Sequence, residues 1–382
     1  MKLSTDRILT THVGSLPRPD ALADMLLQRE AGEVVDAAAF GQAVRAAVFA
    51  VVRRQVELGI DIVSDGEMAK IGYSTYIKDR CTGFTGNSAR RPPADLARFP
   101  AYMERQAKNN EAPPVTRPVC TGKITIKDRA PLETDIKNFR AALGGAGATD
   151  AFLNASSPGV ISAFLPNEYY PTEHAYLEAL GAVMREEFEA ITQAGFVLQV
   201  DCPDLAMARH TQYKDLTDDE FVRQAEKQVE VLNAALSNVP AEQLRMHICW
   251  GNYEGPHDFD IPLHKIAKVL CRAKPQAISF EASNPRHAHE WKVWGEIDLP
   301  ADKVLIPGVI DTCTNYIEHP DLVAERICRF ADIVGRERVL AGTDCGLSTF
   351  TRYGHVLPDI GYEKLKALAA GAEIASRRLW RS

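Results

Sequence analysis

The stretch HAYLEALGAVMREEFEAITQAG (residues 174–195), followed directly by FVLQVDCPD (196–204), decides the fold of this 382-residue chain. The first part has apolar residues at helical spacing and ends on glycine, which predicts an amphipathic helix. The second part is a short apolar run that ends in polar residues, which predicts a buried strand. A helix that leads directly into a buried strand is the repeating unit of parallel α/β folds.

The same alternation of helical and apolar patterns recurs along the whole chain. Three more segments have apolar residues at helical spacing: 37–59, 218–239 and 322–335. Eight short apolar runs are expected to form strands: 7–15, 60–67, 150–158, 196–204, 245–252, 277–285, 304–312 and 338–346. Strands that alternate with helices eight times predict an α/β fold of the (β/α)8 TIM barrel type, whose strands are covered on both faces.

Residues 68–149 interrupt this alternation, because they lie between the second and third expected strands and do not follow its spacing. Within them, RPVCTGKITIKDR (117–129) has the pattern of a hairpin. We therefore expect a single barrel domain, residues 1–382, with an insertion at 68–149 that covers one end of the barrel.

The composition predicts a soluble protein that acts on small molecules. The formal net charge is −7 and no run of Lys and Arg stands out, so nothing favours nucleic acid or an anionic membrane surface as a partner. The N-terminus lacks the features of a signal peptide, and no apolar run reaches the ~18 residues of a membrane span, so we expect a cytoplasmic protein. The eight cysteines are scattered and are expected to be reduced. A homo-oligomer is compatible with these features.

Several expected strands end in side chains that bind metals. His247 and Cys249 end one strand, and Glu281 and Cys345 end two later ones. Barrel strands meet at one face with their carboxyl ends, and residues i and i+2 of a strand point the same way, so these side chains are expected to lie together. Their N, S, O and S donors suit tetrahedral zinc. The alternatives are a buried histidine and cysteine without metal, or a metal-free barrel enzyme that uses Asp and Glu for acid–base chemistry.

The four side chains and the motifs around them resemble the cobalamin-independent methionine synthase family, and specifically its catalytic barrel. The matching motifs follow the family's order along nearly the whole chain: THVGSLP (11–17), Gly66-Glu67, QVDCP (199–203), His247-x-Cys249, SFE (279–281) and DCG (344–346). The resemblance implies that His247, Cys249, Glu281 and Cys345 bind Zn²⁺. It also implies a zinc-dependent transferase that activates a small thiol as a thiolate for alkyl or methyl transfer to sulfur.

Two branches of the family remain open for the substrate. In the methionine-forming branch, Ser15, Glu67 and Asp201 match residues that hold homocysteine, and two carboxylates beside an ammonium are chemically sensible. In the single-barrel branch of epoxyalkane:coenzyme M transferases the thiol opens an epoxide, and Arg286 and His287 would face a sulfonate or an alkoxide. A C–S lyase is a further alternative, grouped with epoxide opening by coenzyme M. The expected partners are a small thiol and an alkyl or methyl donor, such as methylfolate, methylcobalamin or an epoxide.

The chain departs from the family pattern in two ways. Full-length synthases carry a second, N-terminal barrel that helps to hold polyglutamylated methylfolate, and this chain begins at the catalytic barrel, so we expect a methyl donor other than the standard folate. Where the family has an acid–base histidine, this chain has Cys313. His319 and His12 are the candidate catalytic acids or bases. A zinc-holding protein that binds thiols without turnover is the alternative from another functional class.

Overall fold

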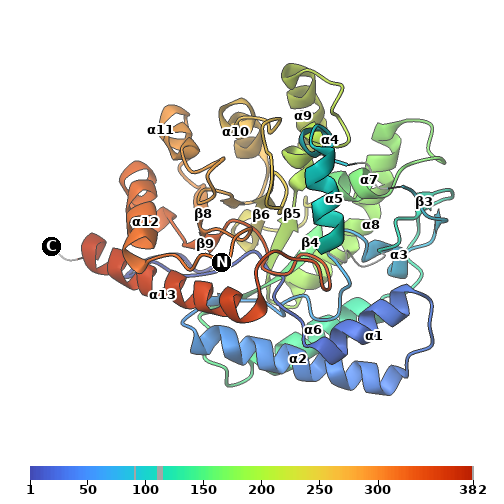
Figure 1. Cartoon of the computed structure of the whole chain (residues 1–382), viewed down its shortest axis with the longest axis horizontal. Coiled ribbons are helices and arrows are strands. Elements are labelled where there is room, and N and C mark those ends of the chain that lie inside the picture. The colour runs from blue at the N-terminus through green and yellow to red at the C-terminus, as the bar shows by residue number, and fades with distance from the viewer. Residues whose placement is uncertain (90–91, 110–114, 381–382) are drawn as a thin grey trace.

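The centre of the molecule is a curled sheet of seven parallel strands (Figure 1). The computed structural model describes residues 1–89, 92–109 and 115–380. In their order across the sheet the strands are β1 (Ile62–Val63), β4 (Asp150–Ser156), β5 (Val197–Asp201), β6 (Leu244–Ile248), β7 (Ala277–Phe280), β8 (Val304–Ile310) and β9 (Gly342–Thr343). Six of these strands lie inside a segment that the sequence analysis assigned to a strand, and β6 begins one residue before the expected segment 245–252.

An extended segment near the N-terminus, residues 9–11, lies between the two edge strands of the sheet. On one side the Thr11 backbone N–H donates to the Ala341 carbonyl (2.8 Å), and the Ala341 N–H donates to the Leu9 carbonyl (2.9 Å). On the other side the Ile62 N–H donates to the Thr10 carbonyl (3.0 Å). This segment therefore has backbone hydrogen bonds to residues at both edges of the seven-stranded sheet, to Ala341 next to β9 and to Ile62 of β1.

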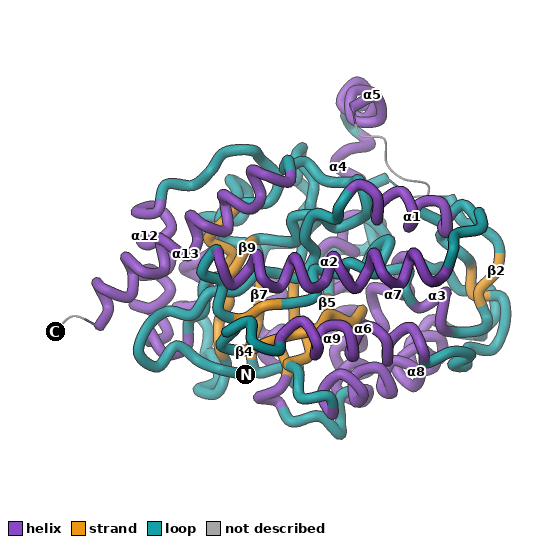
Figure 2. The backbone as a smooth tube through the Cα atoms, turned by 90° about the horizontal axis from the view of Figure 1, so that it is seen from below, coloured by secondary structure: helices purple, strands orange, loops and turns teal. Residues whose placement is uncertain are grey.

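Helices surround the sheet on its outer side, as Figures 1 and 2 show. The α-helices are α1 (Asp20–Glu30), α2 (Ala37–Glu57), α3 (Ile77–Arg80), α4 (Ala94–Ala97), α5 (Pro100–Asn109), α6 (Ala130–Leu143), α7 (Pro158–Phe164), α8 (Glu173–Gln193), α9 (Asp218–Ala235), α10 (Leu263–Arg272), α11 (Val293–Glu296), α12 (Pro320–Val334) and α13 (Pro358–Trp380). The four helices expected from the sequence are α2, α8, α9 and α12. Among the described residues, no helix is both long and apolar enough to cross a lipid bilayer.

The ends of these helices follow from local sequence. α9 begins at a capping box, in which Thr217 accepts from the backbone of Glu220 and the Glu220 carboxylate accepts from the backbone of Thr217. α8 ends just before Gly195, whose φ of 88° lies in the left-handed region that glycine adopts without strain. The expected helices therefore stop within a few residues of the predicted ends.

The chain between β1 and β4 contains α3, α4, α5, α6 and a small two-stranded sheet. In this sheet β2 (Phe84–Thr85) pairs antiparallel with β3 (Val119–Cys120), so the pairing joins residues far apart in sequence, where we expected a local hairpin at 117–129. The last helix before β4 is α6, which packs on α2 in the outer layer (Figure 2). Helix α5 projects from one side of the molecule. Residues 90–91 and 110–114 of the expected insertion lie outside the described residues.

A buried arginine fills the middle of the curled sheet. Arg245 on β6 is fully buried, and its guanidinium donates to Gln199 Oε1 (2.7 Å) and Thr11 Oγ1 (2.8 Å) and lies 3.8 Å from the centre of the Phe152 ring. Because side chains alternate along a strand, Arg245 shares the inner face of β6 with His247. The guanidinium therefore links β5, β6 and the N-terminal segment beneath the site described next.

Candidate metal and substrate site

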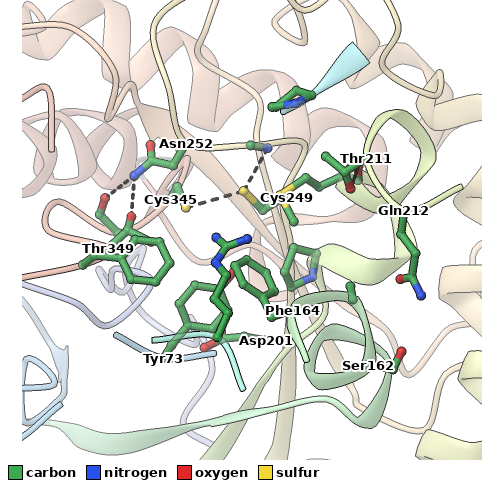
Figure 3. A pocket seen from close by; sticks show the side chains of 18 of the residues that line it. Tyr73, Ser162, Phe164, Asp201, Thr211, Gln212, Cys249, Asn252, Cys345 and Thr349 are labelled. Atoms are coloured by element: carbon green, nitrogen blue, oxygen red, sulfur yellow. Dashed lines mark hydrogen bonds between the residues drawn. The ribbon is translucent and has the colours of Figure 1, made fainter. Parts of the chain in front are cut away.

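A cavity of about 390 Å³ lies where the carboxyl ends of the strands meet. Six of the residues singled out in the sequence line it: Ser15, Glu67, Asp201, His247, Cys249 and Cys345. Figure 3 shows part of the lining, in which Cys249 and Cys345 point toward each other and Asn252 lies next to Cys345. The cavity therefore brings together residues from segments that are up to 330 positions apart in the sequence.

Three side chains in this cavity are arranged as metal ligands. The donor atoms of His247, Cys249 and Cys345 all lie within 4.8 Å of one another, and all three residues are buried. Cys249 Sγ and Cys345 Sγ are 3.7 Å apart. Two thiolates bound to one tetrahedral zinc at ~2.3 Å lie about 3.8 Å apart, so the sulfur separation matches a shared zinc ion.

The surroundings of the three ligands also fit a cation. Neither ring nitrogen of His247 has a hydrogen-bond partner of ordinary geometry among the described residues, although the side chain is buried. Burial and then the nearby Arg245 lower the pKa of His247 to about 3. The contact with Cys345 and burial together raise the pKa of Cys249 well above its usual value. A neutral imidazole is a metal ligand, and a bound cation would stabilise both thiolates.

Glu281, the fourth expected ligand, is held beside Cys249 by its own partners. Its Oε1 accepts from the Trp250 backbone N–H (2.8 Å), and its Oε2 accepts from Asn284 Nδ2 (2.7 Å). Burial, followed by the nearby Cys249, raises the pKa of Glu281 well above its usual value. Asp344 in turn accepts hydrogen bonds from the backbone of residues 282–284, and thereby fixes the loop that carries Asn284.

Replacing Asn284 with alanine is expected to weaken zinc binding by about 10–100-fold, because residues that orient metal ligands contribute to affinity in this range. The variant removes the amide that donates to Glu281 Oε2. Competition with a chromophoric chelator would measure the change in affinity. Asn238→Ala is the matched control, since Asn238 donates to Glu189 on the surface (2.8 Å), and this variant is expected to bind zinc as the parent does.

Two buried carboxylates mark the other end of the cavity. Asp201, at the end of β5, accepts from Gln199 Nε2 (2.7 Å) and from Asn154 Nδ2 (3.2 Å). Burial and then the nearby Glu67 raise the pKa of Asp201 to about 7. Glu67 is also buried, and the Arg18 guanidinium lies 4.0 Å from its Oε2. An ammonium group between the two carboxylates would relieve their mutual repulsion.

Local backbone geometry places Glu67 and Ser15 at this end. Glu67 has a φ of 57°, a conformation that is uncommon for a residue other than glycine. The Asp65 carboxylate accepts from the Glu67 N–H (2.9 Å) and stabilises this turn. Ser15 approaches Gly346 so closely that a Cβ added to Gly346 would lie 1.9 Å from Ser15 Oγ. Glycine in the DCG motif is therefore required if Ser15 is to line the cavity next to Cys345.

The two candidate catalytic histidines lie away from the cavity. His12 is buried beneath it, where Nε2 is 2.6 Å from Gln55 Oε1 and Nδ1 accepts from the Gly14 N–H (3.1 Å), so both nitrogens are occupied within the core. His319 is largely exposed at the start of α12, and its Nδ1 accepts from the Asp321 N–H (3.2 Å). His12 therefore has hydrogen bonds within the core and His319 caps a helix. Neither lines the cavity, where the expected catalytic role would require it.

Arg286 and His287 also turn away from the cavity. His287 is buried, with Nδ1 2.8 Å from Glu290 Oε2 and Nε2 3.0 Å from Asp260 Oδ2. Although burial lowers it, these hydrogen bonds raise the pKa of His287 to about 10. Arg286 lies at the surface, 3.9 Å from the same Asp260 carboxylate. Neither residue lines the cavity, so neither is placed to contact a sulfonate or an alkoxide there.

Asn252, Tyr73 and Phe164 also line the cavity, and the sequence analysis did not single them out. Asn252 donates to the Gly346 carbonyl (2.8 Å) and to Thr349 Oγ1 (2.7 Å), and its Oδ1 accepts from Cys313 Sγ (3.4 Å). Cys313, which replaces the family histidine, is therefore close to the cavity but is tied to Asn252. Three rings form an aromatic wall with centroids 5.9–6.4 Å apart: Tyr73, Phe164 and Phe350. Trp250, which follows Cys249, is fully buried and does not line the cavity, and its Nε1 donates to the Ile261 carbonyl (2.7 Å).

Known proteins resemble the chain over nearly its full length. Two methionine synthases, from Thermococcus kodakarensis and Sulfolobus acidocaldarius, are each 26% identical and cover 97% of this chain and 94% and 93% of their own length. A solved structure of a B12-independent methionine synthase from Shewanella sp. W3-18-1, in complex with selenomethionine, superposes with a TM-score of 0.73 at 20% identity and covers 98% of this chain and 99% of its own. This structural likeness supports the fold.

The sequence also matches a protein family directly. The family described as "Cobalamin-independent synthase, Catalytic domain" matches residues 8–161 and 159–356. These ranges include the segments that carry Ser15, Glu67, Asp201, His247 and Cys345, all of which line the one cavity. The match covers most of the chain. The chain therefore belongs to the cobalamin-independent methionine synthase family.

Proposed function

We propose that this protein is a zinc-dependent methyltransferase that forms methionine from homocysteine. The observation that carries the proposal is the shared cavity, in which two cysteines and a histidine at ligand spacing face two buried carboxylates. The curated relatives named methionine synthase have nearly the same length as this chain, which supports a single-barrel form of that activity. We infer that the seven strands and segment 9–11 form a closed (β/α)8 barrel around this cavity.

The residues present assign a task to each end of the cavity. His247, Cys249, Cys345 and Glu281 would hold the zinc, and when bound it would lower the pKa of a coordinated substrate thiol so that the sulfur is anionic at neutral pH. Glu67 and Asp201 would bind the ammonium of homocysteine and so orient its sulfur toward the cysteines. The aromatic wall of Tyr73, Phe164 and Phe350 would exclude water and leave the remaining volume to the methyl donor.

The positions of the charged residues and of the metal-binding cysteines argue against an epoxyalkane:coenzyme M transferase and against a non-catalytic zinc protein. Arg286 and His287, the residues expected to face the sulfonate in an epoxyalkane:coenzyme M transferase, lie outside the cavity lining, and Arg117 is the cationic side chain that lines it among the described residues. The carboxylates Glu67 and Asp201 would repel such a sulfonate. A non-catalytic zinc site would be closed by protein ligands on all sides, whereas Cys249 and Cys345 line an open cavity of about 390 Å³.

A product assay tests the proposal. Zinc-loaded protein would be incubated with homocysteine and either methylfolate or methylcobalamin, and with coenzyme M and an epoxide in parallel, and thioether products would be identified by mass spectrometry. We expect methionine with at least one methyl donor. Thioether formation from coenzyme M and the epoxide alone would overturn the proposal in favour of the other branch.

A further inference from the structure

A second cluster of buried, metal-binding side chains lies outside the cavity. Asp95 comes from α4, His210 ends the 3₁₀ helix Met207–His210 after β5, and Asp260 lies in the loop between β6 and α10. One donor atom from each lies within 4.8 Å of the other two, and all three side chains are at most 6% exposed. None of them is part of the thiolate site.

The imidazole at the centre of this cluster lacks a regular hydrogen bond. His210 Nδ1 lies 3.0 Å from Asp260 Oδ1 and 3.6 Å from Asp95 Oδ2, which are ion-pair distances only if the ring is protonated. Neither contact has the alignment of a hydrogen bond, and Nε2 likewise has no partner of ordinary geometry among the described residues. A buried nitrogen aimed between two carboxylate oxygens, without hydrogen-bond alignment, is the arrangement that a bound cation would complete.

The groups around the cluster orient the two carboxylates from outside. Tyr253 Oη donates to Asp95, 3.1 Å from each carboxylate oxygen. The second oxygen of Asp260, Oδ2, is 3.0 Å from His287 Nε2 and 3.1 Å from His257 Nδ1. Asp260 Oδ1 lies 3.0 Å from His210 Nδ1 and also 3.3 Å from His257 Nδ1. Carboxylate ligands that are themselves held by hydrogen bonds are typical of metal sites.

We propose that Asp95, His210 and Asp260 form a second metal site that binds a first-row divalent transition ion. One imidazole and two carboxylates suit zinc, manganese or iron, whereas Mg²⁺ and Ca²⁺ favour oxygen ligands alone. The ion would join α4 to the loops that follow β5 and β6. Because Ser88, Ala89 and Pro93, which precede α4, line the cavity, this link would help to hold these three residues in the lining. The site is independent of the proposed function.

Zinc stoichiometry tests the second site. The parent protein and a Cys249→Ser/Cys345→Ser variant would be stripped with a chelator and then dialysed against zinc alone. We expect two zinc ions per parent chain and one per chain in the thiol-free variant. Zinc should also raise the melting temperature of the thiol-free variant, because a ligand that binds only the folded state stabilises it.

Variants of the cluster complete the test. His210→Gln and Asp260→Asn, each added to the thiol-free variant, are expected to weaken the remaining zinc by about 100-fold or more. Asp258→Asn is the matched control, because Asp258 lies in the same loop but is exposed and pairs with Arg98. A folded thiol-free variant that binds no zinc would overturn the proposal and leave a hydrogen-bonded cluster. If the thiolate site binds no zinc but the second site does, the parent and the thiol-free variant would each hold one zinc ion per chain. That result would contradict the proposed function and not the second site.

Discussion

Replacing Cys345 with serine is expected to remove one equivalent of zinc per chain and to lower kcat/KM for methionine formation by about 10³-fold or more. A metal that acts as a Lewis acid contributes several kcal/mol to the transition state, and each ~1.4 kcal/mol corresponds to a factor of ten in rate. Serine keeps the size of the side chain but is a poor zinc ligand at neutral pH. Atomic absorption and steady-state kinetics on the same preparation would measure both effects.

Cys271→Ser is the matched control for this experiment. Cys271 lies on α10, is partly buried and does not line the cavity, so its replacement is expected to change neither zinc content nor kcat/KM. A Cys345→Ser protein that keeps its full zinc content and its activity would contradict the assignment of the metal ligands.

Replacing Asp201 with asparagine is expected to weaken homocysteine binding by about tenfold or more while zinc is retained. A charge-assisted hydrogen bond contributes roughly 1.5–3 kcal/mol, which the neutral amide loses. The parent should also bind homocysteine less tightly as the pH falls through 7. The pKa of Asp201 in the protein without substrate is about 7, and only the ionised carboxylate pairs with the ammonium. The variant should lose this part of the pH dependence. Isothermal titration at several pH values measures both effects.

Coenzyme M is the control ligand for the same titrations, because it has a thiol but carries a sulfonate in place of the ammonium. Its affinity should be unchanged or higher in Asp201→Asn and in Glu67→Gln, since each substitution removes a like charge. If both variants bind homocysteine as the parent does, Glu67 and Asp201 do not form the amino-acid pocket.

Local patterns in the sequence predicted the parts of the fold that depend on side-chain periodicity. Seven of the eight expected segments contain the parallel strands of the sheet, and they were recognisable because parallel strands covered on both faces are short, apolar and separated by helices. The shared face of His247 and Cys249 follows from the two-residue period of a strand. The convergence of Ser15, Glu67, Asp201 and Cys345 was expected because the carboxyl ends of parallel strands lie at one edge of a curled sheet, whatever their separation in sequence.

Other features depend on contacts that no local pattern encodes. His12 pairs with Gln55 on α2, which only the packed structure shows. The strand at 119–120 pairs with 84–85 across a long excursion, so its hairpin-like composition was misleading. The roles of Asn284 and Asp344 in orienting Glu281 and its loop likewise arise from long-range hydrogen bonds.

The most direct test of the central claim is the absorption spectrum of the protein loaded with cobalt(II) in place of zinc. Sulfur-to-cobalt charge-transfer bands in the near ultraviolet arise only where thiolates bind the metal, so a second site with nitrogen and oxygen ligands does not contribute to them. We predict such bands in the parent, their loss in the Cys249→Ser/Cys345→Ser variant, and an increase when homocysteine is added to the parent. A cobalt-loaded parent without charge-transfer bands, or with bands that homocysteine leaves unchanged, would contradict the account.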